Sequence, residues 1–191
     1  MEIGVAFDFD GVLVNSYRGI EDFYYNDLPR IIDIDSRLID YIIYMEYVAE
    51  AVGWLREDWW FKTIPSLTEE SYDVLITRYW EKRIESTILN PGIAEVLEYL
   101  RKQGIKLFSV SFRDEIYGLK RYRIELSGID KYLDRILVVG EDVGSRSEGL
   151  SLLIEEYGLD RIIYVDDKPL NLYKIYLELG DKAMLIHYAF K

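Results

Sequence analysis

The sequence of 191 residues contains no cysteine and a single histidine, and these two absences exclude several kinds of chemistry. Without cysteine there is no disulfide bond, no thiol nucleophile and no thiolate metal site. One histidine excludes a multi-histidine metal site and argues against a serine–histidine triad. This residue, His187, follows the apolar run 183–186, and we expect it to be structural. Any metal ion must therefore be one that prefers oxygen ligands, such as Mg²⁺.

Long hydrophobic runs and positive charge are also scarce. No apolar run approaches the roughly 18 residues of a membrane span, and the N-terminus lacks the basic and apolar regions of a signal peptide. We therefore expect a cytoplasmic globular protein with no membrane partner. The net charge of −12 argues against nucleic acid or anionic membranes as partners. It would also repel a phosphorylated substrate, so a phosphate site would need a metal ion and one or two basic side chains.

The N-terminal segment carries the most informative pattern, in which two carboxylates follow a hydrophobic run and precede a glycine. It reads Val-Ala-Phe-Asp-Phe-Asp-Gly-Val-Leu-Val-Asn-Ser over residues 5–16. Because side chains alternate along a strand, Asp8 and Asp10 should point the same way at its carboxyl end, where open α/β sheets bind ligands. Gly11 then permits a sharp turn.

Two carboxylates this close repel each other, so they need a bound cation, a shared proton or both. In one interpretation Asp8 binds Mg²⁺ and attacks a phosphorus atom, while Asp10 donates a proton to the leaving oxygen. The alternative is a Ca²⁺-like turn or a solvated loop.

From about residue 91 onward, helix and strand patterns alternate with short breaks, which indicates a parallel sheet covered on both faces. The predicted strands cover 105–110, 135–139, 162–165 and 183–186. The predicted helices run from Asn90-Pro91-Gly92 to a stop at Gly104, from about 114 to 126, through Leu150 to a stop at Gly158, and from about 169 to 179.

Residues 16–87 show no such alternation and are predicted to form at least three amphipathic helices. All four tryptophans lie in this stretch, where an aromatic stripe is more typical of a helix-bundle core than of a recognition surface. The predicted apolar stripes are Leu38, Ile42, Met45, Ala49 and Val52, and Tyr72, Leu75, Ile76 and Tyr79. We therefore expect an all-helical insertion after the first strand of a Rossmann-like α/β core.

A second acidic site follows another hydrophobic strand, in the segment Tyr-Val-Asp-Asp-Lys-Pro-Leu-Asn over 164–171. Asp166 and Asp167 are either metal ligands or part of a helix N-cap with a favourably placed neighbour.

The first motif resembles that of the haloacid dehalogenase (HAD) superfamily, most of whose members are Mg²⁺-dependent phosphatases. The resemblance implies that Asp8 is the nucleophile, that Asp10 is the general acid/base, and that both contribute to the metal site, Asp10 through its backbone carbonyl. Asp166-Asp167 resembles the fourth motif, whose acid completes the Mg²⁺ shell. Asp167 takes the usual ligand position, although either acid fits the family pattern.

The same resemblance implies a phosphate site made by a hydroxyl at the end of the second core strand and by a lysine near the third. Ser111 fits the hydroxyl position better than Ser109, and Phe112 then stands where a small or amide residue is usual, with its backbone N–H available. No lysine occupies the usual place in the segment 144–149. Arg146 is the natural substitute, being permanently charged and able to bind phosphate bidentately; the alternatives are Lys120 and Lys168.

The insertion is similar to the C1 cap of phosphoglycolate phosphatase-like members, with the core at 1–15 and 88–191 and the cap at 16–87. The resemblance thus implies a Mg²⁺-dependent phosphatase acting on a small phosphorylated metabolite through an aspartyl-phosphate. A phosphomutase and a non-catalytic binding protein that keeps the fold are the alternatives. Neither the oligomeric state nor the substrate follows from the sequence. Five basic residues of the cap are candidates to bind a second anionic group, namely Arg18, Arg30, Arg37, Arg56 and Lys62.

Overall fold

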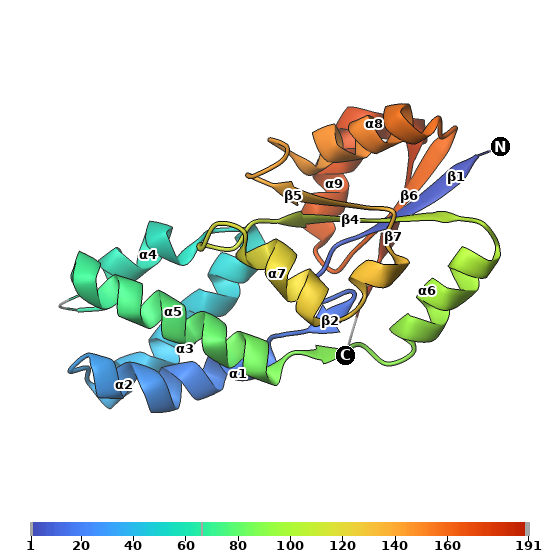
Figure 1. Cartoon of the computed structure of the whole chain (residues 1–191). Coiled ribbons are helices and arrows are strands. Elements are labelled where there is room, and N and C mark those ends of the chain that lie inside the picture. Colours follow the sequence, from blue (N-terminus) through green and yellow to red (C-terminus); the bar gives the residue numbers. More distant parts are fainter. Residues whose placement is uncertain (1, 66, 190–191) are drawn as a thin grey trace. The chain divides into compact units, whose positions relative to one another are not determined.

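The computed structural model describes residues 2–65 and 67–189, so the terminal residues of the predicted core and residue 66 of the insertion lie outside the described part. The chain divides into two compact units (Figure 1). One consists of Met1–Asn15 and Ile88–Lys191, and the other of Ser16–Thr87.

The first unit is built on a five-stranded sheet in the order β5-β4-β1-β6-β7, in which every neighbouring pair is parallel (Figure 1). The strands are β1 (Ile3–Phe7), β4 (Lys106–Phe112), β5 (Arg135–Val139), β6 (Arg161–Asp166) and β7 (Ala183–His187). The central strand β1 pairs with β4 on one side and with β6 on the other, with Phe7 opposite Ser109 and Val165. The carboxyl ends of these three strands therefore lie together at one edge.

Helices cover both faces of this sheet, as predicted for an α/β fold (Figure 1). Leu97 of α6 (Ile93–Lys102) and Ile124 of α7 (Leu119–Leu126) pack with Phe7 and Leu107 on one face. Leu150 and Leu153 of α8 (Arg146–Tyr157), and Leu172 and Ile175 of α9 (Pro169–Leu179), pack with Ala6 and Phe108 on the other. Burying both faces explains why the strands read as continuous hydrophobic runs.

Two helices of this unit begin later than the sequence suggested. Pro91 and Gly92 form a turn in which the Ile93 N–H donates to the carbonyl of Asn90 at 3.2 Å, so α6 begins at Ile93. The helix expected from about residue 114 begins at Leu119, because Gly118 has φ +76°, outside the helical range. The charged residues before it form a loop rather than a helical turn.

All regular elements among the described residues of the second unit are helices. Its helices are α1 (Arg18–Asp22), the π-helix η1 (Phe23–Asp27), α2 (Leu28–Ile31), α3 (Ser36–Val52), α4 (Arg56–Thr63) and α5 (Glu69–Ser86). Phe23, Tyr24, Trp60 and Tyr79 form an aromatic cluster with ring centroids 5.1 to 6.4 Å apart. The unit thus has a core of its own, as its aromatic content indicated.

The buried face of α3 differs from the predicted stripe. Val52 is exposed, while Glu46 is completely buried. The Glu46 carboxylate accepts hydrogen bonds from the hydroxyls of Tyr24 (2.5 Å) and Tyr79 (2.8 Å) and pairs with buried Arg56. A charged residue occupies a core position here because its charge is paired and its oxygens are hydrogen-bonded.

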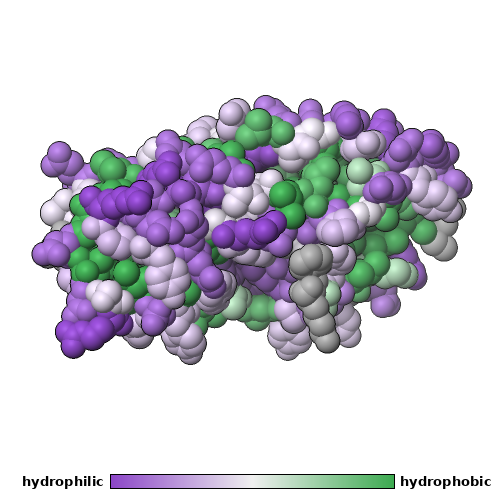
Figure 2. All heavy atoms as spheres, turned by 90° about the horizontal axis from the view of Figure 1, so that it is seen from below, coloured by the Kyte–Doolittle hydropathy of each residue, from purple (hydrophilic) through white to green (hydrophobic). Residues whose placement is uncertain are grey.

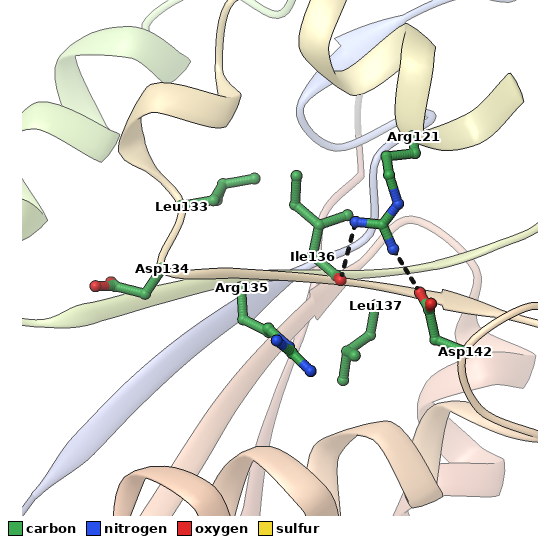
Figure 3. Close-up of a pocket in the computed structure, with 7 residues that line it drawn as sticks. All are labelled: Arg121, Leu133, Asp134, Arg135, Ile136, Leu137 and Asp142. Atoms are coloured by element: carbon green, nitrogen blue, oxygen red, sulfur yellow. Dashed lines mark hydrogen bonds and ion pairs between the residues drawn. The ribbon is translucent and has the colours of Figure 1, made fainter. Parts of the chain in front are cut away.

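Strand β5 is an edge strand, and α7 protects part of its free backbone (Figure 3). Arg121 donates to the Ile136 carbonyl at 3.5 Å and pairs with Asp142 at 2.7 Å, while Asp142 accepts from the Val138 N–H at 2.7 Å. These side chains satisfy groups that an exposed edge would offer to another strand. Together with Leu133 and Arg135 they line a cavity of about 340 Å³.

Hydrophilic side chains cover much of the face in Figure 2, with apolar side chains scattered between them. Among residues 2–65 and 67–189, none of the helices has the length and apolar character needed to cross a membrane.

Candidate active site

Three carboxylates converge at the carboxyl edge of the sheet. Asp8 directly follows β1, Asp166 ends β6, and Asp167 comes next in the chain. The backbone N–H of Asp8 donates to the Val165 carbonyl at 2.9 Å, which ties the two strand ends together. One oxygen atom from each carboxylate lies within 4.8 Å of the others, and Asp8 and Asp166 are buried.

The pKa of Asp8 is raised to about 7, first by burial and then by the negative charge of Asp166. Asp167 raises the pKa of Asp8 further, whereas Arg146 and Lys168 lower it. Burial and neighbouring carboxylates both disfavour the ionised form of Asp8. A bound cation would favour that form, because opposite charges attract. The donor set consists of oxygen atoms, which suits a hard divalent ion, so these residues could hold a metal.

Gly11 makes room for this acidic group. Its φ of +83° is a conformation that other residues rarely adopt, and a Cβ atom there would lie 2.2 Å from Asp167 Oδ2. The loop after β1 is fixed by buried Asn90, whose side-chain amide donates to the carbonyls of Gly11 (3.2 Å) and Val12 (2.7 Å). The short strands β2 (Val14–Asn15) and β3 (Ile88–Leu89) pair next to it.

Asp166 and Asp167 differ in their surroundings. The Asp166 carboxylate accepts from the Lys168 N–H at 2.7 Å, from the Asn171 amide at 3.0 and 3.2 Å, and from the Tyr164 hydroxyl at 3.0 Å. These bonds use most of its lone pairs. Asp167 is half-buried and lies against the loop of Gly11.

Arg146, the first residue of α8, provides positive charge at this site. Its Nη2 atom lies 3.8 Å from Asp8 Oδ1, its Nε atom lies 3.5 Å from Asp166 Oδ2, and it donates to the Tyr164 hydroxyl at 3.1 Å. Burial raises the pKa of Tyr164 well above its usual value, so its hydroxyl stays neutral. Ser145 caps α8 by accepting a hydrogen bond from the Glu148 N–H at 3.0 Å. This cap fixes the first turn of the helix, to which Arg146 belongs.

The predicted phosphate-binding residues of β4 lie at the same edge. Ser111 is buried, with its Oγ atom 3.1 Å from that of Ser109. Phe112 ends the strand and, with Arg146 and Asn171, lines a cavity of about 180 Å³ between α8 and α9.

His187 donates through Nε2 to the Asp167 carbonyl at 3.2 Å, since a carbonyl can only accept.

Asp10 does not share the surroundings of Asp8. Strand β1 ends at Phe7, so strand alternation does not extend to Asp10, and its carboxylate pairs with Lys120 and Arg123 of α7. Lys120, one of the alternatives to Arg146, therefore contacts Asp10 and not Asp8. The cation that lies near Asp8 is Arg146 of α8. Sequence reasoning missed Arg123, Tyr164 and Asp114. The only available signal was the spacing of Lys120 and Arg123, which places both on one side of a helix.

Among the basic residues proposed for the helical unit, Arg56 is buried and paired with Glu46 and Glu50, whereas Arg18, Arg30, Arg37 and Lys62 are exposed.

The fold and site define an α/β protein with a cluster of carboxylates, which could hold a metal ion, at the carboxyl edge of a parallel sheet. Residues 4–172 match the family model of haloacid dehalogenase-like hydrolases, and the chain belongs to this family, as its first motif predicted. No curated protein matches the sequence.

Solved structures share the fold at low sequence identity. A predicted phosphoglycolate phosphatase from Haemophilus somnus has a TM-score of 0.66 and 17% identity, covering 98% of this chain and 85% of its own. A HAD-superfamily hydrolase from Ehrlichia chaffeensis has a TM-score of 0.56 and 19% identity, with coverages of 97% and 87%. A protein proposed to be a β-phosphoglucomutase, from Thermotoga maritima, has a TM-score of 0.58 and 19% identity, with coverages of 100% and 88%.

Proposed function

We propose that this chain is a Mg²⁺-dependent phosphatase that hydrolyses a small phosphate monoester through an aspartyl-phosphate on Asp8. The observation that carries the proposal is the convergence of Asp8, Asp167 and Arg146 at one edge of the sheet. It combines a carboxylate nucleophile, oxygen ligands for a hard cation and a permanent positive charge for the phosphate.

In the first step, a carboxylate oxygen of Asp8 attacks phosphorus and the ester P–O bond breaks, while Asp10 gives its proton to the leaving oxygen. In the second step, water attacks the same phosphorus atom, Asp10 takes the proton from that water, and the Asp8 carboxylate is regenerated with release of inorganic phosphate. Arg146 neutralises charge on the transferring oxygens. Ser111 and the backbone N–H of Phe112 would bind the phosphate.

Asp8, Asp167 and the Asp10 carbonyl would hold the Mg²⁺ ion, with Asp166 beside them. When bound, the ion supplies charge neutralisation to the phosphate and to the acidic cluster. Asp166 is more suited to orient its neighbours, because its oxygens already accept hydrogen bonds from Tyr164, Lys168 and Asn171.

The helical unit, residues 16–87, is proposed as a cap that restricts substrates to small molecules. It has its own aromatic core, and both its connections to the other unit adjoin the short β2–β3 pair. We therefore expect small phosphate esters to be hydrolysed and folded phosphoproteins to be excluded.

The test is hydrolysis of p-nitrophenyl phosphate with Mg²⁺ and with a chelator, comparing the wild type with Asp8→Asn. We expect Mg²⁺-dependent turnover that is lost in Asp8→Asn and kept in Asp181→Asn, a control at an exposed acid outside the site. Acid-quench labelling with a ³²P ester should give a phosphoprotein only when Asp8 is present. Near-normal turnover of Asp8→Asn would contradict the covalent mechanism. Transfer to a second sugar phosphate without net phosphate release would favour a phosphomutase, and a folded protein that binds phosphate esters without turnover would favour a binding protein.

A further inference from the structure

Four charged side chains form a buried cluster around the Asp10 carboxylate, which we call the Asp10 cluster: Asp10, Asp114, Lys120 and Arg123. Their exposed fractions are 9%, 3%, 4% and 3%. Arg123 binds both oxygens of Asp10, with Nη2 2.5 Å from Oδ1 and Nη1 3.2 Å from Oδ2. Lys120 pairs with Asp10 Oδ2 as well.

Asp114 completes the cluster from the other side of the two cations. Its carboxylate lies 2.8 Å from Lys120 Nζ and 3.0 Å from Arg123 Nη1. Each cation therefore bridges the two carboxyl groups. The cluster holds two negative and two positive charges when both acids are ionised, and one negative charge fewer while Asp10 holds the proton that it transfers. The ring of Phe9 lies 5.7 Å from Lys120 Nζ and 5.3 Å from the guanidinium carbon of Arg123, within the range of cation–π contacts.

Three separate segments supply these residues. Asp10 lies in the loop after β1, Asp114 lies in the loop after the neighbouring strand β4, and Lys120 and Arg123 are three residues apart on α7. The spacing on α7 places both cations on the same side of the helix. The cluster thus attaches the loop of the first motif to the helix that follows the second core strand.

Stability alone does not account for this arrangement. Burying charged groups carries a desolvation cost, and apolar side chains of similar volume often stabilise a core as well or better. What the cluster does achieve is orientation, because a carboxylate whose two oxygens are both held by a planar guanidinium has little freedom to rotate.

On the basis of the proposed function, we propose that Lys120 and Arg123 are positioning residues that orient Asp10 for proton transfer. Under this proposal, different cations neutralise the phosphate and orient the general acid/base. Arg146 lies near Asp8, where phosphate is transferred, whereas Lys120 and Arg123 contact the residue that gives a proton to the leaving oxygen and takes one from water. Asp114 holds both cations in place.

This division predicts a dependence on the leaving group. p-Nitrophenolate leaves readily without a proton, whereas phenolate needs one in the transition state. A misplaced acid should therefore slow phenyl phosphate far more than p-nitrophenyl phosphate. Proton donation typically raises a reaction rate about 10² to 10⁴-fold, and a small misplacement of a catalytic group lowers it by up to about 10²-fold. We therefore expect Lys120→Ala and Arg123→Ala to lower kcat on phenyl phosphate about 10- to 100-fold more than kcat on p-nitrophenyl phosphate.

The experiment measures kcat and KM on both esters, in saturating Mg²⁺, for wild type, Lys120→Ala, Arg123→Ala and Arg123→Lys. Arg123→Lys keeps the positive charge but cannot bind both oxygens of Asp10 as the planar guanidinium does, so its selective loss should be smaller than that of Arg123→Ala but not absent. It also carries a smaller risk of misfolding, because the buried charge is kept. Arg121→Ala is the matched control, because Arg121 lies on the same helix but pairs with Asp142. It should have wild-type ratios of the two rates.

A second comparison introduces the same variants into Asp10→Asn. If Lys120 and Arg123 act through Asp10, their selective effect should disappear there, since coupled residues are not additive. Equal losses on the two esters, or an undiminished selective loss in Asp10→Asn, would overturn the positioning role while leaving Asp8-dependent hydrolysis intact. Absence of any Asp8-dependent hydrolysis in the wild type would overturn the proposed function itself and the positioning role with it.

Discussion

Arg146 Nη2 lies 3.8 Å from Asp8 Oδ1, which places a permanent cation beside the proposed nucleophile. The same guanidinium contacts Asp166 and Tyr164, so it is held by groups on β6 while it extends from the start of α8. Burial alone would lower the pKa of Arg146, but Tyr164 first, and then Asp8 and Asp166, raise it above its usual value. In this position its charge would act on both the proposed nucleophile and the phosphate of the proposed substrate.

Replacing this cation should weaken catalysis strongly. Arg146→Ala should lower kcat/KM for p-nitrophenyl phosphate by about 10² to 10³-fold, the effect of removing a group that stabilises transition-state charge. It should also weaken inhibition by inorganic phosphate. Arg146→Lys should retain more activity, because charge matters here beyond the geometry of the guanidinium. Arg135→Ala, an exposed arginine on β5, serves as the control, and unchanged kinetics in Arg146→Ala would transfer the role to Lys168 or Lys120.

Asp166, which ends β6, and Asp167, which follows it, should differ in their effects on metal affinity. Asp167→Asn removes a proposed ligand, whereas Asp166→Asn removes a group already bonded to Tyr164, Lys168 and Asn171. Groups that orient metal ligands typically contribute about 10 to 100-fold in affinity. We expect Asp166→Asn to fall within that range and Asp167→Asn to exceed it, in titrations with Mn²⁺ followed by electron paramagnetic resonance. The reverse order would identify Asp166 as the ligand.

The raised pKa of Asp8 makes the stability of the metal-free protein dependent on pH. The unfolded chain loses this proton near its ordinary pKa of 3.8, whereas the folded chain keeps it up to about pH 7. Between these values the folded state holds more protons, so the free energy of unfolding falls as pH rises. Asp8→Asn cannot ionise and should lack this loss, and the difference between the two proteins should grow by about 2 to 4 kcal/mol from pH 4 to pH 8.

Chemical denaturation in a chelator measures this difference at each pH. Saturating Mg²⁺ should stabilise the wild type more at pH 8 than at pH 5, because the ion and the proton compete for Asp8. A wild-type protein whose stability relative to Asp8→Asn is independent of pH would show that Asp8 titrates normally.

The regular elements of the core could be predicted because their patterns are local. Strand 135–139 and helix 169–179 have the predicted bounds, since the hydrophobic run of the strand and the proline at the start of the helix are strong signals. The predicted start of α7 was wrong, because the charged residues before Gly118 have the composition of an exposed helical turn. The positive φ of Gly118, which excludes a helix there, cannot be read from the sequence.

The candidate site was predictable as far as strand ends could indicate it. The acids at the carboxyl ends of β1 and β6 lie together because those strands are neighbours, which the predicted parallel sheet made plausible. The Asp10 cluster was not predictable, because its other members, Asp114, Lys120 and Arg123, are more than 100 residues away from Asp10 and look like surface charges in the sequence. Glu46 was missed for the same reason, since its burial depends on side chains from three other segments.

The helical unit should depend on the pairing of Glu46 with Arg56. Both side chains are buried, and Glu46→Ala would leave the Arg56 charge with one fewer counterion and remove an acceptor from Tyr24 and Tyr79. Breaking one partner of a buried pair costs about 3 to 5 kcal/mol, so the unit should unfold at a distinctly lower denaturant concentration. Tryptophan fluorescence reports on this unit alone, since all four tryptophans lie within it.

The exposed pair of Arg37 and Asp35 provides the matched control, because Arg37→Ala removes an ion pair from the same unit at its surface. Its fluorescence transition should stay close to that of the wild type. Circular dichroism recorded in parallel would show whether the α/β unit remains folded when the tryptophan signal of Glu46→Ala is lost. A Glu46→Ala transition that coincides with the wild-type transition would mean that the buried network contributes no net stability to these helices.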